Sequence, residues 1–137
     1  MQVNTYLSFD GDCREAFEFY EQCLGGKIQA MMTFGDGPGC NHVPAELHGR
    51  IMHGSIRLGE HFLMGTDGTP DHPYSGINGA HVVLSLPEPE EAERAFEALS
   101  EQGRVEMPIQ ETFWARRFGM TVDRFGVPWM VNCDKEA

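Results

Sequence analysis

The sequence of 137 residues lacks the cysteine spacings of zinc ribbons and of thioredoxin-type redox sites. Its four cysteines are Cys13, Cys23, Cys40 and Cys133, and no two of them form a Cys-x-x-Cys pair. Cys13 and Cys23 lie on one predicted helix, where ten residues span about 15 Å, too far for a disulfide. We therefore expect reduced thiols and a cytoplasmic protein.

Positive charge is scarce. Ten Lys and Arg residues stand against 21 Asp and Glu residues, which gives a formal net charge of −11. Nucleic acids and anionic membranes both attract clustered Lys and Arg, so we expect neither as a partner. The acidic balance is typical of a soluble protein, and it would also favour a cationic ligand.

Long apolar runs and several catalytic motifs are also missing. The sequence has no run of 18 apolar residues and no basic N-terminal region followed by an apolar stretch, so it predicts neither a membrane span nor a signal peptide. It has no Gly-x-Ser-x-Gly elbow. The Gly-rich run at 35–39 lies between predicted strands and does not open a helix, so it is no nucleotide-binding loop.

The sequence does contain one order of elements that occurs twice: a strand, a helix and three strands. Each half is too small to bury its sheet alone, so we expect an α+β fold of two βαβββ modules with cupped, mainly antiparallel sheets. We predict a single domain over 1–137, with modules at about 1–66 and 79–134. The predicted strands are 3–9, 27–34, 50–58, 61–65, 80–86, 104–113, 118–122 and 127–132.

Two helices are predicted from the spacing of apolar residues and from residues that are typical of helix ends. The first follows Asp12, an N-cap residue with Glu15 at the capping-box position, and Gly25 ends it. The second carries Glu residues in its first turn and is expected to end at Gly103.

Three stretches resemble one protein family. They are 6–16, 52–59 and a C-terminal stretch made of 110–114, 118–119 and 123–132. Together they are similar to the PhnB-like branch of the vicinal oxygen chelate superfamily, which includes glyoxalase I, extradiol dioxygenases and bleomycin resistance proteins. The resemblance implies sheets that curl around a small-molecule pocket, and commonly a homodimer. Branch members often carry a ubiquinone-type methyltransferase name, which the missing nucleotide loop argues against.

The resemblance also implies where a metal would be held. Enzymes of the superfamily bind a divalent ion through His and Glu residues on the first, fourth, fifth and eighth strands. The matching residues are Asn4 or a neighbour, Leu63 with Met64 beside it, His81, and Met130. Only His81 is a suitable ligand type, so we expect no standard metal centre and no cofactor.

Three histidines on predicted strands leave other chemistry open. His53, His61 and His81 could form an atypical metal site. His53 and His81 are also candidate acid or base residues near neutral pH. Alternatively, each is an ordinary hydrogen-bonded residue of the core or surface.

The late aromatic residues predict a pocket wall. Trp114, Trp129 and Phe118, together with His53 and Met64, are the expected ligand-binding residues.

Two further pairs of residues carry side chains with possible chemistry. Arg116 and Arg117 could bind a carboxylate or phosphate, or could face solvent. Cys40 and His42 have the residue types of a nucleophile and base, but no third, orienting group is visible.

Three functions therefore remain open. The first is a metal-free small-molecule-binding protein with an aromatic pocket. The second is an enzyme with an atypical metal or a His acid or base. The third is a dimeric module that binds a partner protein.

Overall fold

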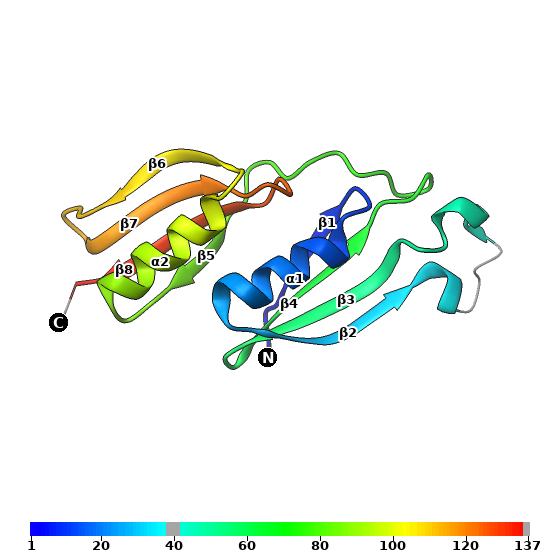
Figure 1. Cartoon of the computed structure of the whole chain (residues 1–137), viewed down its shortest axis with the longest axis horizontal. Helices are drawn as coiled ribbons and strands as arrows, with labels where there is room; N and C mark the ends of the chain where they lie inside the picture. The colour runs from blue at the N-terminus through cyan, green and yellow to red at the C-terminus, as the bar shows by residue number, and fades with distance from the viewer. Residues whose placement is uncertain (38–41, 136–137) are drawn as a thin grey trace. The chain divides into compact units, whose positions relative to one another are not determined.

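The computed structural model describes residues 1–37 and 42–135. The contacts divide the chain into two compact units, Met1–Gly76 (unit 1) and Ile77–Ala137 (unit 2). In each unit a strand, a helix and three strands follow one another (Figure 1). The predicted α+β fold of two βαβββ modules is therefore confirmed. Each predicted module lies within one unit, and their union into a single domain stays a prediction.

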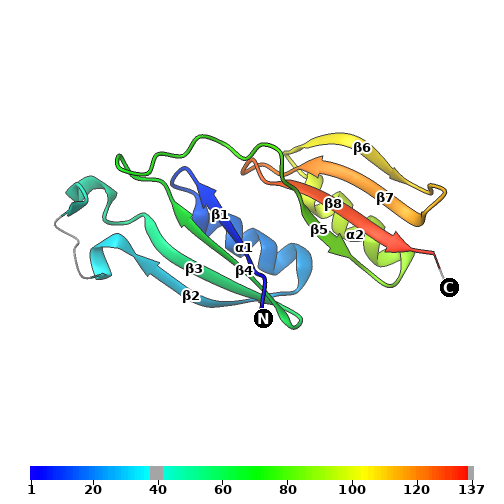
Figure 2. The ribbon, with the colours of Figure 1, turned by 180° about the vertical axis from the view of Figure 1, so that it is seen from behind.

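Unit 1 is a four-stranded sheet with a helix on one face. The sheet order is β1-β4-β3-β2, with β1 parallel to β4 and the other pairs antiparallel. Figure 2 shows the strands from the side opposite α1. The elements are β1 (Thr5–Phe9), α1 (Cys13–Leu24), β2 (Lys27–Thr33), η1 (Phe34–Asp36), η3 (Ala45–Leu47), β3 (Ile51–Leu58) and β4 (His61–Asp67).

Two glycines in the central strands let α1 pack closely on the sheet. A Cβ atom at Gly54 would lie 3.4 Å from the Phe17 ring, and one at Gly65 would lie 3.1 Å from it. Phe17 itself is fully buried. Because successive side chains of a strand point to opposite faces, His53 and Thr66 project away from α1.

A buried aspartate from β4 fixes the start of α1. Asp12 occupies the N-cap position, but its side chain makes no cap hydrogen bond, so the predicted capping box is wrong. Instead Asp67 Oδ1 accepts hydrogen bonds from the backbone N–H groups of Gly11 at 2.9 Å and Cys13 at 3.0 Å. Its Oδ2 accepts the N–H of Ile51 at 2.8 Å. One carboxylate thus joins β4, α1 and β3.

Unit 2 repeats the arrangement, with sheet order β5-β8-β7-β6 and β5 parallel to β8. The buried face of α2 consists of Ala92, Ala95, Phe96 and Leu99, as the spacing predicts. No helix among the described residues is long and apolar enough to cross a membrane. The elements are β5 (Val82–Ser85), α2 (Pro89–Ser100), β6 (Arg104–Gln110), β7 (Ala115–Val122) and β8 (Pro128–Asp134).

Several predicted boundaries in unit 2 differ from the structure by up to three residues. β6 ends at Gln110 instead of residue 113, and β7 begins at Ala115 instead of residue 118. β5 begins at Val82 instead of residue 80, so His81 precedes the strand. α2 ends at Ser100, a little before the expected end at Gly103, and Gln102 adopts the left-handed conformation with φ 59°. Gly103 instead lies against the Val122 backbone oxygen, where a side chain would collide.

Candidate functional site

The face of the unit 1 sheet opposite α1 carries a hydrogen-bonded pair from two different strands. Tyr6 Oη on β1 lies 3.2 Å from His53 Nδ1 on β3. The two ring centroids are 5.8 Å apart, with 31° between the ring planes. β4 lies between these strands, and its Thr66 hydroxyl donates to the carbonyl of Met52 at 2.8 Å.

The phenol of Tyr6 is partly buried and protonated at neutral pH. Half of the residue, 50%, is exposed. Partial burial raises the pKa of Tyr6 above its usual value, and a hydrogen bond with Thr66 offsets part of that rise. The hydroxyl can therefore donate one hydrogen bond and accept others.

Methionines flank the pair. In the strand register Met32 is paired with His53, and Met64 is paired with Tyr6. Met32 is 44% exposed, so the surface beside His53 is apolar and adaptable. We call the set Tyr6, Met32, His53, Met64 and Thr66 the unit 1 face.

The other two candidate histidines lie elsewhere. His81 is exposed and immediately precedes β5 in unit 2. His61 is the exposed first residue of β4, beside the turn that Gly59 makes with φ 64°. Over the described residues, no three His, Cys, Asp or Glu side chains are grouped so that they could hold a metal ion.

Two of the four residues that match the superfamily's metal positions by resemblance, Leu63 and Met130, do not fit a divalent ion. Leu63 is 3% exposed and is paired with the buried Ile56. Met130 is paired with Val83 and Met120, so only thioethers and hydrocarbon surround it in the register. Leucine offers no donor atom, and methionine sulfur is a soft ligand.

Unit 2 carries an aromatic cluster at the start of β7, made of Phe113, Trp114 and Phe118. The Trp114 ring meets Phe118 edge to face at a centroid distance of 5.4 Å, and Phe113 at 4.8 Å. Trp114 is 47% exposed and Phe113 89% exposed. Thr112 holds the turn, because its Oγ1 accepts the Ala115 N–H at 3.1 Å. The predicted residues Trp114 and Phe118 are thus brought together.

Trp129 lies apart from this cluster. It is 1% exposed, and its indole N–H donates to Oδ2 of Asp123 at 2.9 Å. Oδ1 of Asp123 accepts the N–H groups of Phe125 and Val127, which fixes the turn between β7 and β8. The structure therefore places Trp129 in the core of unit 2, and its ligand-binding role stays a prediction.

The arginine pair has acceptors within unit 2. Arg117 forms an ion pair with Glu93 at 2.6 Å, and this carboxylate raises the pKa of Arg117. Arg116 donates to the carbonyls of Asp134 and Pro87 at 2.8 and 2.7 Å. These contacts account for both guanidinium groups. Of the pair Cys40 and His42, Cys40 lies outside the described residues.

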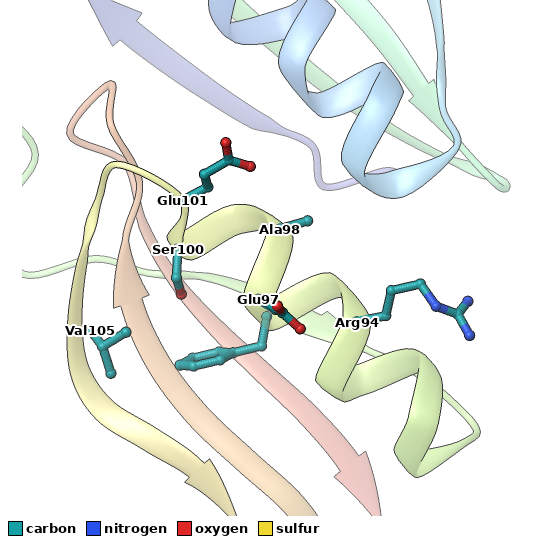
Figure 3. Close-up of a pocket in the computed structure, with 7 residues that line it drawn as sticks. Arg94, Glu97, Ala98, Ser100, Glu101 and Val105 are labelled. Atoms are coloured by element: carbon teal, nitrogen blue, oxygen red, sulfur yellow. The ribbon is translucent and has the colours of Figure 1, made fainter.

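A hollow of about 680 Å³ lies between α2 and β6 (Figure 3). It contains none of the residues that the sequence predicts as ligand-binding. The ionisable side chains at its rim are exposed, and the Ser100 hydroxyl donates to Thr121. The hollow therefore shows no polar group reserved for a ligand. Its lining residues are Arg94, Phe96, Glu97, Ala98, Ser100, Glu101 and Val105.

Sequence reasoning missed Tyr6 as a site residue. The available signal was the alternation in β1, where Leu7 and Phe9 are buried while Tyr6 and Ser8 are exposed. That pattern indicates on which face of the sheet Tyr6 lies, but it does not indicate that His53 is its partner. The partner depends on the parallel register with β4, which a short strand does not specify.

Comparisons with known proteins agree with this architecture. A family model described as "Glyoxalase/Bleomycin resistance protein/Dioxygenase superfamily" matches residues 2–131. Protein YjdN of Escherichia coli (strain K12) is 35% identical over 144 residues, which cover 99% of this chain and 97% of that protein.

Two solved structures extend the comparison. Protein PA1353 from Pseudomonas aeruginosa has a TM-score of 0.91 at 48% identity, with 99% of both chains covered. A Bacillus cereus protein, described as a putative 3-demethylubiquinone-9 3-methyltransferase and PhnB protein, has a TM-score of 0.80 at 21% identity. The match covers 97% of this chain and 99% of that one, and it shows a common fold.

Proposed function

The chain belongs to the glyoxalase/bleomycin resistance protein/dioxygenase superfamily, and on that basis we propose that it binds a small organic molecule without the superfamily's metal. The observation that carries this proposal is the aromatic cluster. An exposed Trp114 held edge to face on Phe118 offers a large apolar surface with one N–H donor. Such a surface suits the wall of a ligand site.

The donor chemistry at the four metal positions supports the metal-free form of the proposal. By the family resemblance, Leu63 and Met130 are the residues that match His or Glu ligands of the superfamily enzymes. A hard divalent ion at these positions would lose two of its expected ligands.

The test is a ligand screen by thermal shift, followed by calorimetric titration of each hit. Trp114→Ala should weaken binding at least about tenfold, because truncating a central aromatic contact commonly costs more than 1.4 kcal/mol. Val105→Ala, in the hollow of unit 2, and His81→Ala are the matched controls and should change affinity less than about twofold. Equal affinity in wild type and Trp114→Ala would refute the role of the cluster.

A second candidate function is an enzyme that uses His53 as an acid or base. The hydrogen bond between His53 and Tyr6 favours it, because a partner on one ring nitrogen orients the imidazole. His53→Ala should then abolish turnover of a hit compound while leaving the protein folded. Full turnover in that variant would exclude this form of the enzyme.

A methyltransferase activity is not proposed. The methyltransferase name belongs to the Bacillus cereus protein, and the two chains share a fold at 21% identity. The sequence of this chain also lacks a Gly-x-Gly-x-x-Gly loop between a strand and a helix.

We also propose a homodimer, the assembly that the family resemblance implies, in the cytoplasm, which the cysteine pattern favours. Sedimentation equilibrium at micromolar concentration is expected to give twice the chain mass of 15.3 kDa. A single-chain mass at that concentration would contradict the dimer.

A further inference from the structure

The segment 68–81, which joins β4 of unit 1 to β5 of unit 2, contains no helix or strand (Figure 1). It carries the one Asn-Gly dipeptide of the sequence, Asn78-Gly79. Both residues are exposed, and Gly79 takes the left-handed conformation with φ 80°. A Cβ atom at Gly79 would meet nothing within 4 Å. The space beside this peptide bond is therefore open to water.

An Asn-Gly dipeptide can react with itself. The backbone nitrogen that follows an asparagine can attack Cγ of that asparagine and close a five-membered ring. A side chain on the following residue hinders this attack, and glycine has none. A fold suppresses the attack where the nitrogen donates a hydrogen bond, because the local structure must then open before the ring can form.

Hydrogen bonding sets Asn78-Gly79 apart from the three Asp-Gly dipeptides of the sequence, which could close the same ring. Over residues 1–37 and 42–135, neither the side-chain amide of Asn78 nor the N–H of Gly79 has a hydrogen-bond partner. In each Asp-Gly dipeptide the glycine N–H donates to an acceptor. These bonds are Gly68 to the Phe9 carbonyl at 2.8 Å, Gly11 to Asp67 Oδ1 at 2.9 Å and Gly37 to the Phe34 carbonyl at 3.3 Å.

We propose that Asn78 is a site of deamidation that proceeds in water without an enzyme or a cofactor. The Gly79 nitrogen gives its proton to solvent and bonds to Cγ of Asn78. The bond from Cγ to Nδ2 breaks, and the leaving nitrogen takes a proton from solvent and departs as ammonia. One water then opens the resulting succinimide at either carbonyl, which leaves aspartate or isoaspartate at position 78. Each route consumes one water and releases one ammonia.

The modification changes the segment between the units while leaving the units folded. It adds one negative charge to a chain whose formal net charge is −11. In the isoaspartate product the backbone runs through the former side chain, so the connection between the units gains one methylene group. Since Asn78 holds no hydrogen bond within either unit, the unfolding temperature should not change. This inference does not depend on the proposed function.

Asn132 supplies the comparison within the same chain. It lies in β8, between β5 and β7, and its Nδ2 donates to Asp134 at 2.8 Å. The following residue, Cys133, is paired with Arg117 of β7. Ring closure at Asn132 would therefore require the sheet of unit 2 to open.

The test is mass spectrometry of the full chain, held in mildly alkaline buffer with a reductant and sampled over weeks. Trypsin gives a peptide 58–94, in which Asn78 is the only Asn or Gln residue. It also gives a peptide 125–135, in which Asn132 is the only one. Peptide 58–94 should gain the mass of an amide NH₂ replaced by OH, and peptide 125–135 should not. Digestion of protein that was never incubated corrects for deamidation during the digest.

Synthetic peptides around each asparagine give the rates without a fold. Asn78 in the full chain should react within about threefold of its own peptide, and Asn132 at least about tenfold more slowly than its own. Gly79→Ala, which adds a Cβ beside the attacking nitrogen, should slow the reaction of Asn78 several-fold. Asn78→Ser should abolish the mass change, and the aged wild-type protein should unfold at the same temperature as this variant.

The outcomes decide the proposal directly. Conversion of peptide 58–94 alone, at the rate of the free peptide, would support it. If peptide 58–94 kept its mass while the synthetic peptide converted, the segment 68–81 would hold Asn78 in a protected conformation and the proposal would fail. Equal protection of Asn78 and Asn132 would overturn it as well, because the two sites would then not differ in structure as the hydrogen bonds indicate.

Discussion

The indole N–H of Trp129 donates a 2.9 Å hydrogen bond to the buried carboxylate of Asp123. The same carboxylate accepts two backbone N–H groups from the turn between β7 and β8. A side chain that resembles a pocket wall in the sequence is therefore part of the hydrogen-bonded core of unit 2.

This bond predicts a stability effect for Trp129→Phe. Phenylalanine removes the N–H donor from a buried charged acceptor, so the free energy of unfolding should fall by about 1–3 kcal/mol. Urea unfolding followed by circular dichroism measures it. Trp114→Phe, at a half-exposed position, should change the free energy by less than about 0.5 kcal/mol. If Trp129→Phe instead matched Trp114→Ala in its loss of ligand affinity, Trp129 would belong to the pocket wall after all.

Asp67, although it lies at the end of β4, should contribute strongly to the stability of unit 1. Asp67→Asn puts an amide donor where the carboxylate now accepts N–H groups from α1 and β3. Because donors would then face donors, we expect a loss of about 2–4 kcal/mol in the free energy of unfolding. The exposed Asp71→Asn is the control, with an expected change below about 0.5 kcal/mol. Similar stabilities for the two variants would show that Asp67 does not hold the start of α1.

The element order could be predicted from the sequence because apolar spacing and turn residues are local signals. Gly25 does end α1 in the left-handed conformation, with φ 74°. The predictions that failed depend on contacts between distant residues. Asp12 is a good N-cap by type, but an aspartate that lies 55 residues later provides the cap hydrogen bonds. The role of Tyr6 depends in the same way on strand register.

Gly119 in β7 should not tolerate a side chain. A Cβ atom there would lie 2.7 Å from the Phe96 ring and 3.0 Å from the backbone of Ile109. Gly119→Ala should therefore lower the free energy of unfolding by about 1–3 kcal/mol through overpacking. Gly49→Ala, where a Cβ meets nothing within 4 Å, is the matched control. If Gly119→Ala left the stability unchanged in thermal unfolding, α2 would pack less closely on β7 than the structure shows.

Stability should fall at alkaline pH through Cys13. Burial raises the pKa of this thiol well above its usual value of about 9, and the carboxylates of Asp67 and Asp12 add to the rise. Above pH 9 the unfolded thiol loses its proton while the folded one keeps it. The unfolding free energy should then decline by up to about 1.4 kcal/mol per pH unit. Cys13→Ala should show a flatter profile between pH 8 and about 10, whatever its stability at pH 7. If the unfolding free energies of wild type and Cys13→Ala declined in parallel with pH, the Cys13 thiol would be in contact with water.

Metal content gives the most direct decision between binding protein and metalloenzyme. Protein expressed in metal-supplemented medium and purified without a tag or chelator should contain less than about a tenth of an equivalent of Zn, Ni, Mn or Fe, because two of the four ligand positions hold Leu63 and Met130. Elemental analysis measures this. A near-stoichiometric metal would contradict the donor-set argument and would mean that other residues supply the ligands. His53→Ala and His81→Ala would then be the first variants to assay, and loss of the metal in either would identify a ligand.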